Sequence, residues 1–203
     1  MGRWGPDARG PLEQAAVDLC LEHGYAQVTV VAIAQRAGFS ERTFYRHFAD
    51  KPEVLFAGFQ YFHDNVVNLV ASAATSAVPM EMVAAAFERA GAVFPENAER
   101  LRQRQSVIDS TPELRARELS KVATLTAAVT EALLQRGVAN PAAMLSAEAG
   151  TLAFRIAFAT WISATGQEAW PRLFRQTLDD IGVVITSAVS DRTAPFERQC
   201  VSI

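Results

Sequence analysis

Cysteine and histidine are scarce in this sequence, and their scarcity excludes several kinds of site. Only two cysteines, Cys20 and Cys200, are present, and they form neither zinc-type spacing nor a disulfide framework, which fits a reducing cytosol. The three histidines are His23, His47 and His63. No zinc-protease helix, glycine-rich phosphate loop or nucleophile elbow is present. We therefore expect no metal, no cofactor and no enzymatic activity.

The chain also lacks an excess of positive charge and an uninterrupted apolar run. Its formal net charge is −3, and residues 1–51 carry six basic and six acidic residues, so a DNA-binding hypothesis must rest on a local motif. The most apolar long stretch, residues 142–165, contains Glu148 and Arg155. Two central ionisable groups argue against a membrane span, and no signal peptide is recognisable. We expect a cytoplasmic protein without a membrane partner.

Helical periodicity predominates, and the expected fold class is all-α with about nine helices. One helix is expected to end at Gly24, a second to begin after Thr29, a third after Ser40 and a long fourth to run from Asp50 to about Ala74. Prolines mark several later helix starts. Five further helices are expected near residues 80–92, 95–109, 112–136, 141–165 and 167–188. The predicted domains are residues 1–51 and 52–189, followed by a flexible tail, residues 190–203.

The segment from Thr29 to Phe48 has the spacing of a helix-turn-helix. Two short crossing helices need a small residue where they touch, which Ala34 supplies, and a turn with positive φ, which Gly38 supplies. Phe44 and Phe48, one helical turn apart, should anchor the second helix to the core. Its opposite face is then free to enter a DNA groove.

These residues, together with the Thr43–Phe48 run and Lys51, resemble the signature of the tetracycline-repressor (TetR) family of bacterial regulators. The resemblance covers about Leu12 to Leu55 and implies a three-helix head joined to a helical ligand-binding and dimerisation domain. It also implies DNA contacts. Phosphate contacts are carried over to Thr29, Ser40, Tyr45, His47 and Lys51, base contacts to Glu41, Arg42 and Thr43, and either contact to Arg46.

The last two predicted helices carry apolar stripes that suit a dimer interface, where the family resemblance also places it. The interface residues predicted there are Leu152, Arg155, Ile156, Leu178, Ile181 and Ile185. The alternative is that the stripes are intramolecular core. Arg155 suits either an ion pair with Asp179 or Asp180 across the dimer or a role as a ligand anchor.

The middle helices combine large aromatic residues with alanine-rich turns, a pattern compatible with a pocket for a small hydrophobic or amphipathic effector. The predicted pocket residues are Phe62, Val66, Phe87, Arg102, Gln105, Phe158 and Trp161, and each aromatic residue among them could equally be core. The sequence predicts a homodimeric repressor released from a palindromic double-stranded DNA operator by its effector and associated with the bacterial nucleoid. A DNA-bound nucleoid-type factor without an effector is the alternative.

Overall fold

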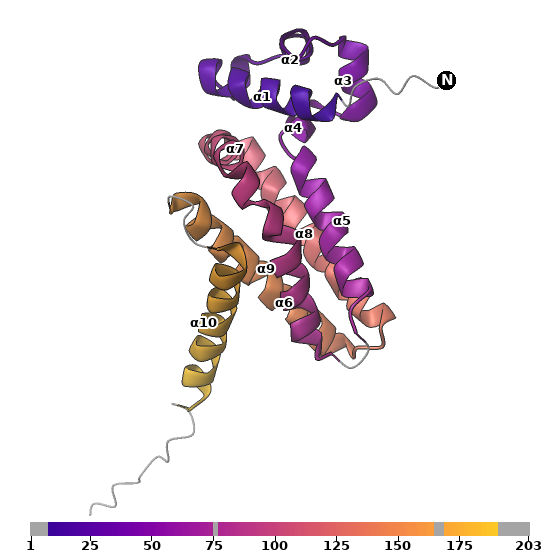
Figure 1. The fold of residues 1–203 in the computed structure, drawn as a ribbon, viewed down its shortest axis with the longest axis vertical. Coiled ribbons are helices and arrows are strands. Elements are labelled where there is room, and N and C mark those ends of the chain that lie inside the picture. The colour runs from indigo at the N-terminus through magenta and orange to yellow at the C-terminus, as the bar shows by residue number, and fades with distance from the viewer. Residues whose placement is uncertain (1–7, 75–76, 165–168, 191–203) are drawn as a thin grey trace, which may run out of the picture.

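The computed structural model describes residues 8–74, 77–164 and 169–190 (Figure 1). These residues form ten α-helices, of which α4 is a single turn, and three short 3-10 turns, with no strand among them. The predicted all-α class is thereby confirmed. The helices are α1 Arg9–His23, α2 Val30–Arg36, α3 Glu41–His47, α4 Lys51–Val54, α5 Ala57–Ala71, α6 Pro79–Ala90, α7 Ala98–Ser110, α8 Pro112–Gln135, α9 Asn140–Ser163 and α10 Trp170–Ser190. The predicted tail, residues 190–203, lies outside the described residues except for Ser190, the last residue of α10.

The α1–α4 segment, which we call the head, lies together at one end of the molecule (Figure 1). Its buried core includes Leu12, Ala16 and Ile33, and it extends past Lys51 to Phe56. The same buried cluster takes in Val107, Ile108 and Leu114 from α7 and α8. The head therefore shares its core with the ends of α7 and α8, which restricts how far it moves independently of the rest of the protein.

The long fourth helix that the sequence predicted is broken between α4 and α5, so this prediction is wrong in detail. The amides of Leu55 and Phe56 bond three residues back, to Pro52 and Glu53, and Phe56 leaves helical geometry at φ −109° and ψ 12°. Both side chains are almost completely buried, at 1% and 0% exposure. The amide of Phe59 bonds to the carbonyl of Phe56. The break thus leaves the carbonyl of Leu55 without a helical amide, and Arg104 of α7 donates a hydrogen bond to it instead.

The larger helical part of the protein, which we call the body, is built on an aromatic cluster between α5, α6, α9 and α10. Phe62 stacks on Phe154 with ring centroids 4.7 Å apart, and Phe87 stacks on Phe174 at 5.6 Å. The indole of Trp170 donates to the carbonyl of Phe87 at 3.1 Å. Aromatic side chains supply much of the buried apolar area of a core of this size. The cluster holds the four helices together.

Two features of the body differ from the sequence-based expectations. Residues between α6 and α7 form two 3-10 turns, Gly91–Val93 and Pro95–Asn97, so α7 begins at Ala98 rather than at Pro95. Helix α9 alone, among the described helices, is long and apolar enough to cross a membrane by length and composition. It packs against α6, α8 and α10, and the core helix of a globular fold passes the same test.

Candidate nucleic-acid interface and effector cavity

The two helices of the predicted helix-turn-helix begin and end at the residues that the sequence indicated. The hydroxyl of Thr29 accepts from the amide of Ala32, and that of Ser40 accepts from the amide of Thr43, so both residues are helix N-caps. Gly38 has φ +77°, a conformation that side chains with a Cβ rarely adopt. Its amide and that of Phe39 bond back to α2. These local interactions fix the crossing of α2 and α3.

Phe44 and Phe48 anchor α3 to the head, with 0% and 2% of their surfaces exposed. Their rings lie 5.4 Å apart. The opposite side of α3 faces solvent: Glu41, Arg42 and Arg46 are exposed, and Tyr45 exposes 53% of its surface. Because Phe44 and Phe48 are buried in the head, the opposite face of α3 is the one that solvent, or DNA, can reach.

The exposed face of α3 combines cations with hydrogen-bonding groups. Arg46 lies 3.4 Å from the ring nitrogen Nε2 of His47, and the hydroxyl of Thr43 lies 3.0 Å from that of Ser40. Within the described part of the chain, Glu41, Arg42 and Arg46 make no ion pair. Unpaired guanidinium groups on a protruding helix can bond to phosphate oxygens or guanine edges.

Lys51 lies elsewhere in the head and has a different set of contacts. Its ammonium donates to the carbonyl of Tyr25 at 2.9 Å and to that of Val28 at 3.0 Å. It also lies 3.8 Å from the centre of the Tyr25 ring. Tyr25 belongs to a 3-10 turn, Tyr25–Gln27, that the sequence-based reading did not anticipate. Two of the three ammonium hydrogens are therefore committed to the head itself.

Another head cation is neutralised on the surface. Arg36, at the end of α2, makes a two-point contact with Glu22 of α1, at 3.0 and 2.7 Å. This pair raises the pKa of Arg36 and lowers that of Glu22 through their mutual hydrogen bond. Arg36 of α2 is therefore neutralised by Glu22, whereas Arg42 and Arg46 of the neighbouring helix α3 have no acidic partner in the described part of the chain.

A cavity of about 780 Å³ lies between α5, α7, α8 and α9, and Glu13 of α1 reaches its lining. Of the predicted pocket residues, Phe62, Gln105 and Phe158 line it. Val66, Phe87 and Trp161 do not line it, because they are completely buried in the core. Arg102 is also outside the lining and lies 3.5 Å from Glu99. Three of the seven predicted pocket residues therefore line this cavity, and four do not.

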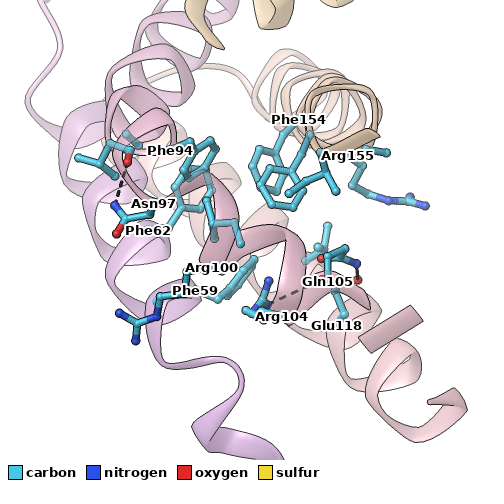
Figure 2. A pocket seen from close by; sticks show the side chains of 18 of the residues that line it. Phe59, Phe62, Phe94, Asn97, Arg100, Arg104, Gln105, Glu118, Phe154 and Arg155 are labelled. Atoms are coloured by element: carbon cyan, nitrogen blue, oxygen red, sulfur yellow. Dashed lines mark hydrogen bonds and ion pairs between the residues drawn. The ribbon is translucent and has the colours of Figure 1, made fainter. Parts of the chain in front are cut away.

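The cavity has an aromatic end and a polar end (Figure 2). Phe62, Phe94 and Phe154 gather at the first, and Arg104, Gln105 and Glu118 at the second. Phe94, Arg104, Phe154 and Glu118 also line the cavity and were not among the predicted pocket residues. Periodicity identifies apolar helix faces, but it does not distinguish a ring that borders empty space from one in contact on all sides.

Arg104 links the polar end of the cavity to the head. Only 6% of its surface is exposed, and its Nε donates to the carbonyl of Leu55 that the α4–α5 break releases. Its guanidinium lies 5.3 Å from the ring centre of Phe56. Burial lowers the pKa of Arg104, and the nearby Glu118 carboxylate opposes that shift. A buried cation needs partners of this kind.

Further ion pairs join the head to α7 and α8. Arg117 lies 2.9 Å from Asp50 and 3.2 Å from Glu53, and Lys121 lies 2.8 Å from Glu53. In addition, Arg100 of α7 contacts Glu13 of α1 at 2.6 Å. Two of the helices that border the cavity, α7 and α8, are therefore bonded directly to the head.

The predicted dimer stripe is solvent-exposed in the single chain. Leu152, Ile156 and Ile185 expose 43%, 45% and 60% of their surfaces, and Leu145, also on α9, exposes 64%. Leu178 and Ile181 are partly buried against the core, and Arg155 is exposed. Exposed apolar residues gathered on neighbouring helices are typical of an interaction surface.

The stripe also borders the cavity. Leu152, Arg155 and Ile156 line it, and Leu152 and Arg155 line a second groove as well, of about 1010 Å³, between α8, α9 and α10. Figure 2 shows Arg155 pointing away from the aromatic rings. The cavity thus opens toward the exposed apolar face.

Comparison with known proteins follows this division into head and body. Residues 13–57 match the family model described as bacterial regulatory proteins, tetR family. Residues 77–186, more than half of the chain, match the MftR C-terminal domain. The chain belongs to the TetR family. It is a DNA-binding transcriptional regulator of that family, a class of regulatory proteins rather than of enzymes.

Solved structures of other bacterial regulators share this fold. SmeT of Stenotrophomonas maltophilia, solved in complex with triclosan, matches with a TM-score of 0.60 and 20% identity, over 87% of this chain and 90% of SmeT. FadR of Bacillus subtilis, solved with stearoyl-CoA, matches with a TM-score of 0.54 and 17% identity, over 84% of this chain and 95% of that one. FadR of Bacillus halodurans matches with a TM-score of 0.52 and 20% identity, over 88% and 95%.

No curated protein sequence matches the chain. The structural matches at these identities establish the fold, and the family models establish membership of the TetR family. The assignment of individual residues to DNA, effector or partner must therefore be argued from this chain's own geometry.

Proposed function

We propose that this TetR-family regulator is a homodimeric repressor that a small hydrophobic or amphipathic effector releases from its operator. The observation that carries the proposal is the position of Arg104, which borders the cavity and bonds to Leu55 at the junction of head and body. A molecule that entered the cavity would contact the group that holds the head. The complexes of SmeT with triclosan and FadR with stearoyl-CoA support an effector role for a cavity in this fold.

In the DNA complex, α3 would lie in the major groove with its exposed face toward the bases. Arg42 would donate to a guanine, Thr43 would contact a thymine methyl group and Glu41 would accept from a cytosine amino group. Arg46 would contact either a base or a phosphate. Phosphate oxygens would bond to the hydroxyls of Thr29, Ser40 and Tyr45 and to His47.

Lys51 receives a different assignment from the one that the family resemblance implies. Because its ammonium already donates to Tyr25 and Val28, we assign it to positioning the 3-10 turn that precedes α2. Its effect on DNA binding would then come through the geometry of the head. One remaining ammonium hydrogen is the most that it offers a phosphate.

Release would follow from a shift between two head positions. An effector that binds better when α7 and α8 move apart would draw Arg104 on α7 away from Leu55, or Arg117 and Lys121 on α8 away from Glu53, and would thereby loosen the attachment of the head. A differential affinity of ~5.5 kcal/mol between the two arrangements would shift the head equilibrium from about 1:99 to 99:1, and a difference of a few kcal/mol would release the operator in part. The cavity favours this function over that of a nucleoid-type factor without an effector.

The second copy would pack its α9 and α10 against the exposed stripe and form a four-helix bundle. Arg155 would then face an acidic side chain, Asp179 or Asp180, across the interface, since all three are exposed in the single chain. The same contact would cover the side of the cavity that Leu152 and Ile156 line. We expect such a dimer in the cytoplasm, associated with the nucleoid.

A mobility-shift assay tests the proposal, using the purified full chain and duplex DNA from upstream of its own gene at low salt. Retardation is expected for the wild type. Ile156→Glu places a charge in the stripe and should yield a monomer, measured by analytical ultracentrifugation, that binds this DNA far more weakly. Leu21→Glu, a change at a leucine that exposes 47% of its surface on α1, is the matched control. A wild-type protein that fails to retard the DNA contradicts the proposal.

A further inference from the structure

The aromatic end of the cavity fits the apolar part of a ligand. Besides Phe62, Phe94 and Phe154, its lining includes Leu101 and Ile162. A volume of about 780 Å³ lies within the range of sites that bind drug-sized molecules. Apolar walls of this kind favour an alkyl or aryl group, but they do not select its polar head. Selection must come from the few polar atoms at the other end.

The first of these polar groups is the guanidinium of Arg104, which still has donors to offer. Its Nε is used by the carbonyl of Leu55. Its Nη2 lies 3.8 Å from the nearest carboxylate oxygen, that of Glu118, which is too long for a hydrogen bond. Among the described residues, the two terminal nitrogens have no hydrogen-bond acceptor. A ligand with a hydrogen-bond acceptor at this end of the cavity could therefore bond to the terminal nitrogens of Arg104.

The second polar group is the amide of Gln105, which still has an acceptor to offer. Its nitrogen Nε2 donates to Asp109 at 2.9 Å and to Glu118 at 3.3 Å. Its oxygen Oε1 is buried and has no partner in the described part of the chain. A buried polar atom without a partner is costly. A ligand that also carries a hydrogen-bond donor at this end could therefore bond to Gln105 Oε1.

The charges around Arg104 are already balanced. Three acidic residues, Glu118, Glu13 and Asp109, act on its guanidinium. The whole lining has three arginines, Arg100, Arg104 and Arg155, and four acids, Glu13, Glu96, Asp109 and Glu118. Of these arginines, Arg100 is paired with Glu13 at 2.6 Å. A ligand carboxylate would add an anion beside Glu118, whereas an ammonium would add a cation beside Arg104, and both are unfavourable at short range.

From these groups we infer that the cavity selects an uncharged amphiphile whose head carries both an acceptor and a donor, as a carboxamide does, in preference to a carboxylate. The carbonyl oxygen of such a head accepts from Arg104, and its N–H donates to Gln105 Oε1 or to Glu118. This inference rests on the proposed effector role of the cavity and specifies the ligand class. It makes Glu118 the residue that discriminates against acids.

Isothermal titration calorimetry on the full-length protein at pH 7 tests the inference with three probes of equal chain length: octanamide, octanoate and octylammonium. Octanamide should bind tightest, by about tenfold over octanoate, because the carboxylate would leave Gln105 Oε1 without a donor and would lie beside the Glu118 carboxylate. Glu118→Gln should tighten octanoate binding and narrow the ratio between the two. Glu96→Gln removes the same charge from an exposed residue of the lining and should leave the ratio unchanged.

Three results would overturn the inference. Octanoate binding as tightly as octanamide would show that the acidic residues do not discriminate. An unchanged ratio in Glu118→Gln, with circular dichroism and melting like the wild type, would remove Glu118 from selection. Absence of binding by all three probes would show that the cavity holds no amphiphile of this size. The mobility-shift assay run in parallel separates these failures from failure of the proposed repressor function, because DNA binding by the unliganded protein does not depend on the ligand head.

Discussion

Lys51 allows one substitution to discriminate between two roles, phosphate contact and support of the head. In Lys51→Met the apolar stem is retained and the ammonium is lost. The carbonyls of Tyr25 and Val28 then lose their donor, and the Tyr25 ring loses the cation that lies 3.8 Å from its centre. The head core is continuous with residues of α7 and α8, so we expect the loss to lower the stability of the whole chain.

The expected magnitude follows from these contacts. A hydrogen bond from a charged donor contributes ~1.5–3 kcal/mol, and a cation–π contact adds ~0.5–1 kcal/mol. Desolvation of a half-buried ammonium offsets part of the sum, which leaves a decrease of about 2–4 kcal/mol in the free energy of unfolding. For a chain of this size that corresponds to a Tm lower by roughly 4–16 °C.

Urea unfolding followed by circular dichroism measures this decrease, and fluorescence anisotropy with labelled upstream DNA at several salt concentrations measures the phosphate contribution. Arg42→Met is the matched control, since it removes the same charge from an exposed residue without an ion pair in the described part of the chain. It should change stability by less than about 0.5 kcal/mol and still weaken DNA binding. The reasoning is refuted if Lys51→Met unfolds like the wild type and reduces the salt slope by about one phosphate.

Three further predictions concern the packing and the junction. Burial raises the pKa of the Cys20 thiol to about 11, so in a Cys200→Ser variant Ellman's reagent at pH 8 should label Cys20 only as fast as the protein unfolds; rapid labelling of the folded chain would contradict this. A methyl group at Gly150 would collide with Val83 of α6, so Gly150→Ala should lower stability by about 1–3 kcal/mol in urea unfolding, whereas Gly58→Ala, with open space around it, should not. Glu53→Gln removes the carboxylate that pairs with Lys121 and Arg117. Because Glu53 is partly exposed, we expect the free energy of unfolding in urea to fall by only ~1 kcal/mol. A larger decrease would contradict this expectation and show that the junction depends on these ion pairs.

Local rules were sufficient for the helix-turn-helix. The hydroxyls of Thr29 and Ser40 can cap a helix wherever they occur, Gly38 allows the turn, and a pair of phenylalanines four residues apart must face one side. These features depend on neighbours in the sequence. The structure reproduces each of them because nothing elsewhere in the fold competes with them.

The junction between head and body could not be predicted in the same way. Residues 50–74 have a continuous helical pattern, and the break at Leu55–Phe56 serves partners that are remote in the sequence: Arg104, 49 residues away, takes the freed carbonyl. The contact of Lys51 with Tyr25 likewise spans 26 residues. Such pairings depend on how helices meet, which a periodic pattern does not record.

The cavity illustrates a second limit. Val66, Phe87 and Trp161 have the same apolar character and helical spacing as Phe62 and Phe158, yet the first three are enclosed by neighbours and the last two border empty space. Gln105 was among the predicted pocket residues. That Gln105 has a free acceptor and Arg104 free donors, however, depends on the hydrogen-bond partners that each side chain finds in the folded chain.

The central claim is that two copies of α3 recognise DNA through the exposed face that contains Arg42. Selection of binding sequences from a pool of random duplexes, with the wild type and with Arg42→Ala, tests it most directly. The wild type should enrich an inverted repeat with half-sites about one helical turn (~34–36 Å) or a small multiple apart. Arg42→Ala should enrich the same repeat with its preference relaxed at one position in each half-site. Enrichment of no repeat by the wild type, or an unaltered repeat with Arg42→Ala, would contradict the account.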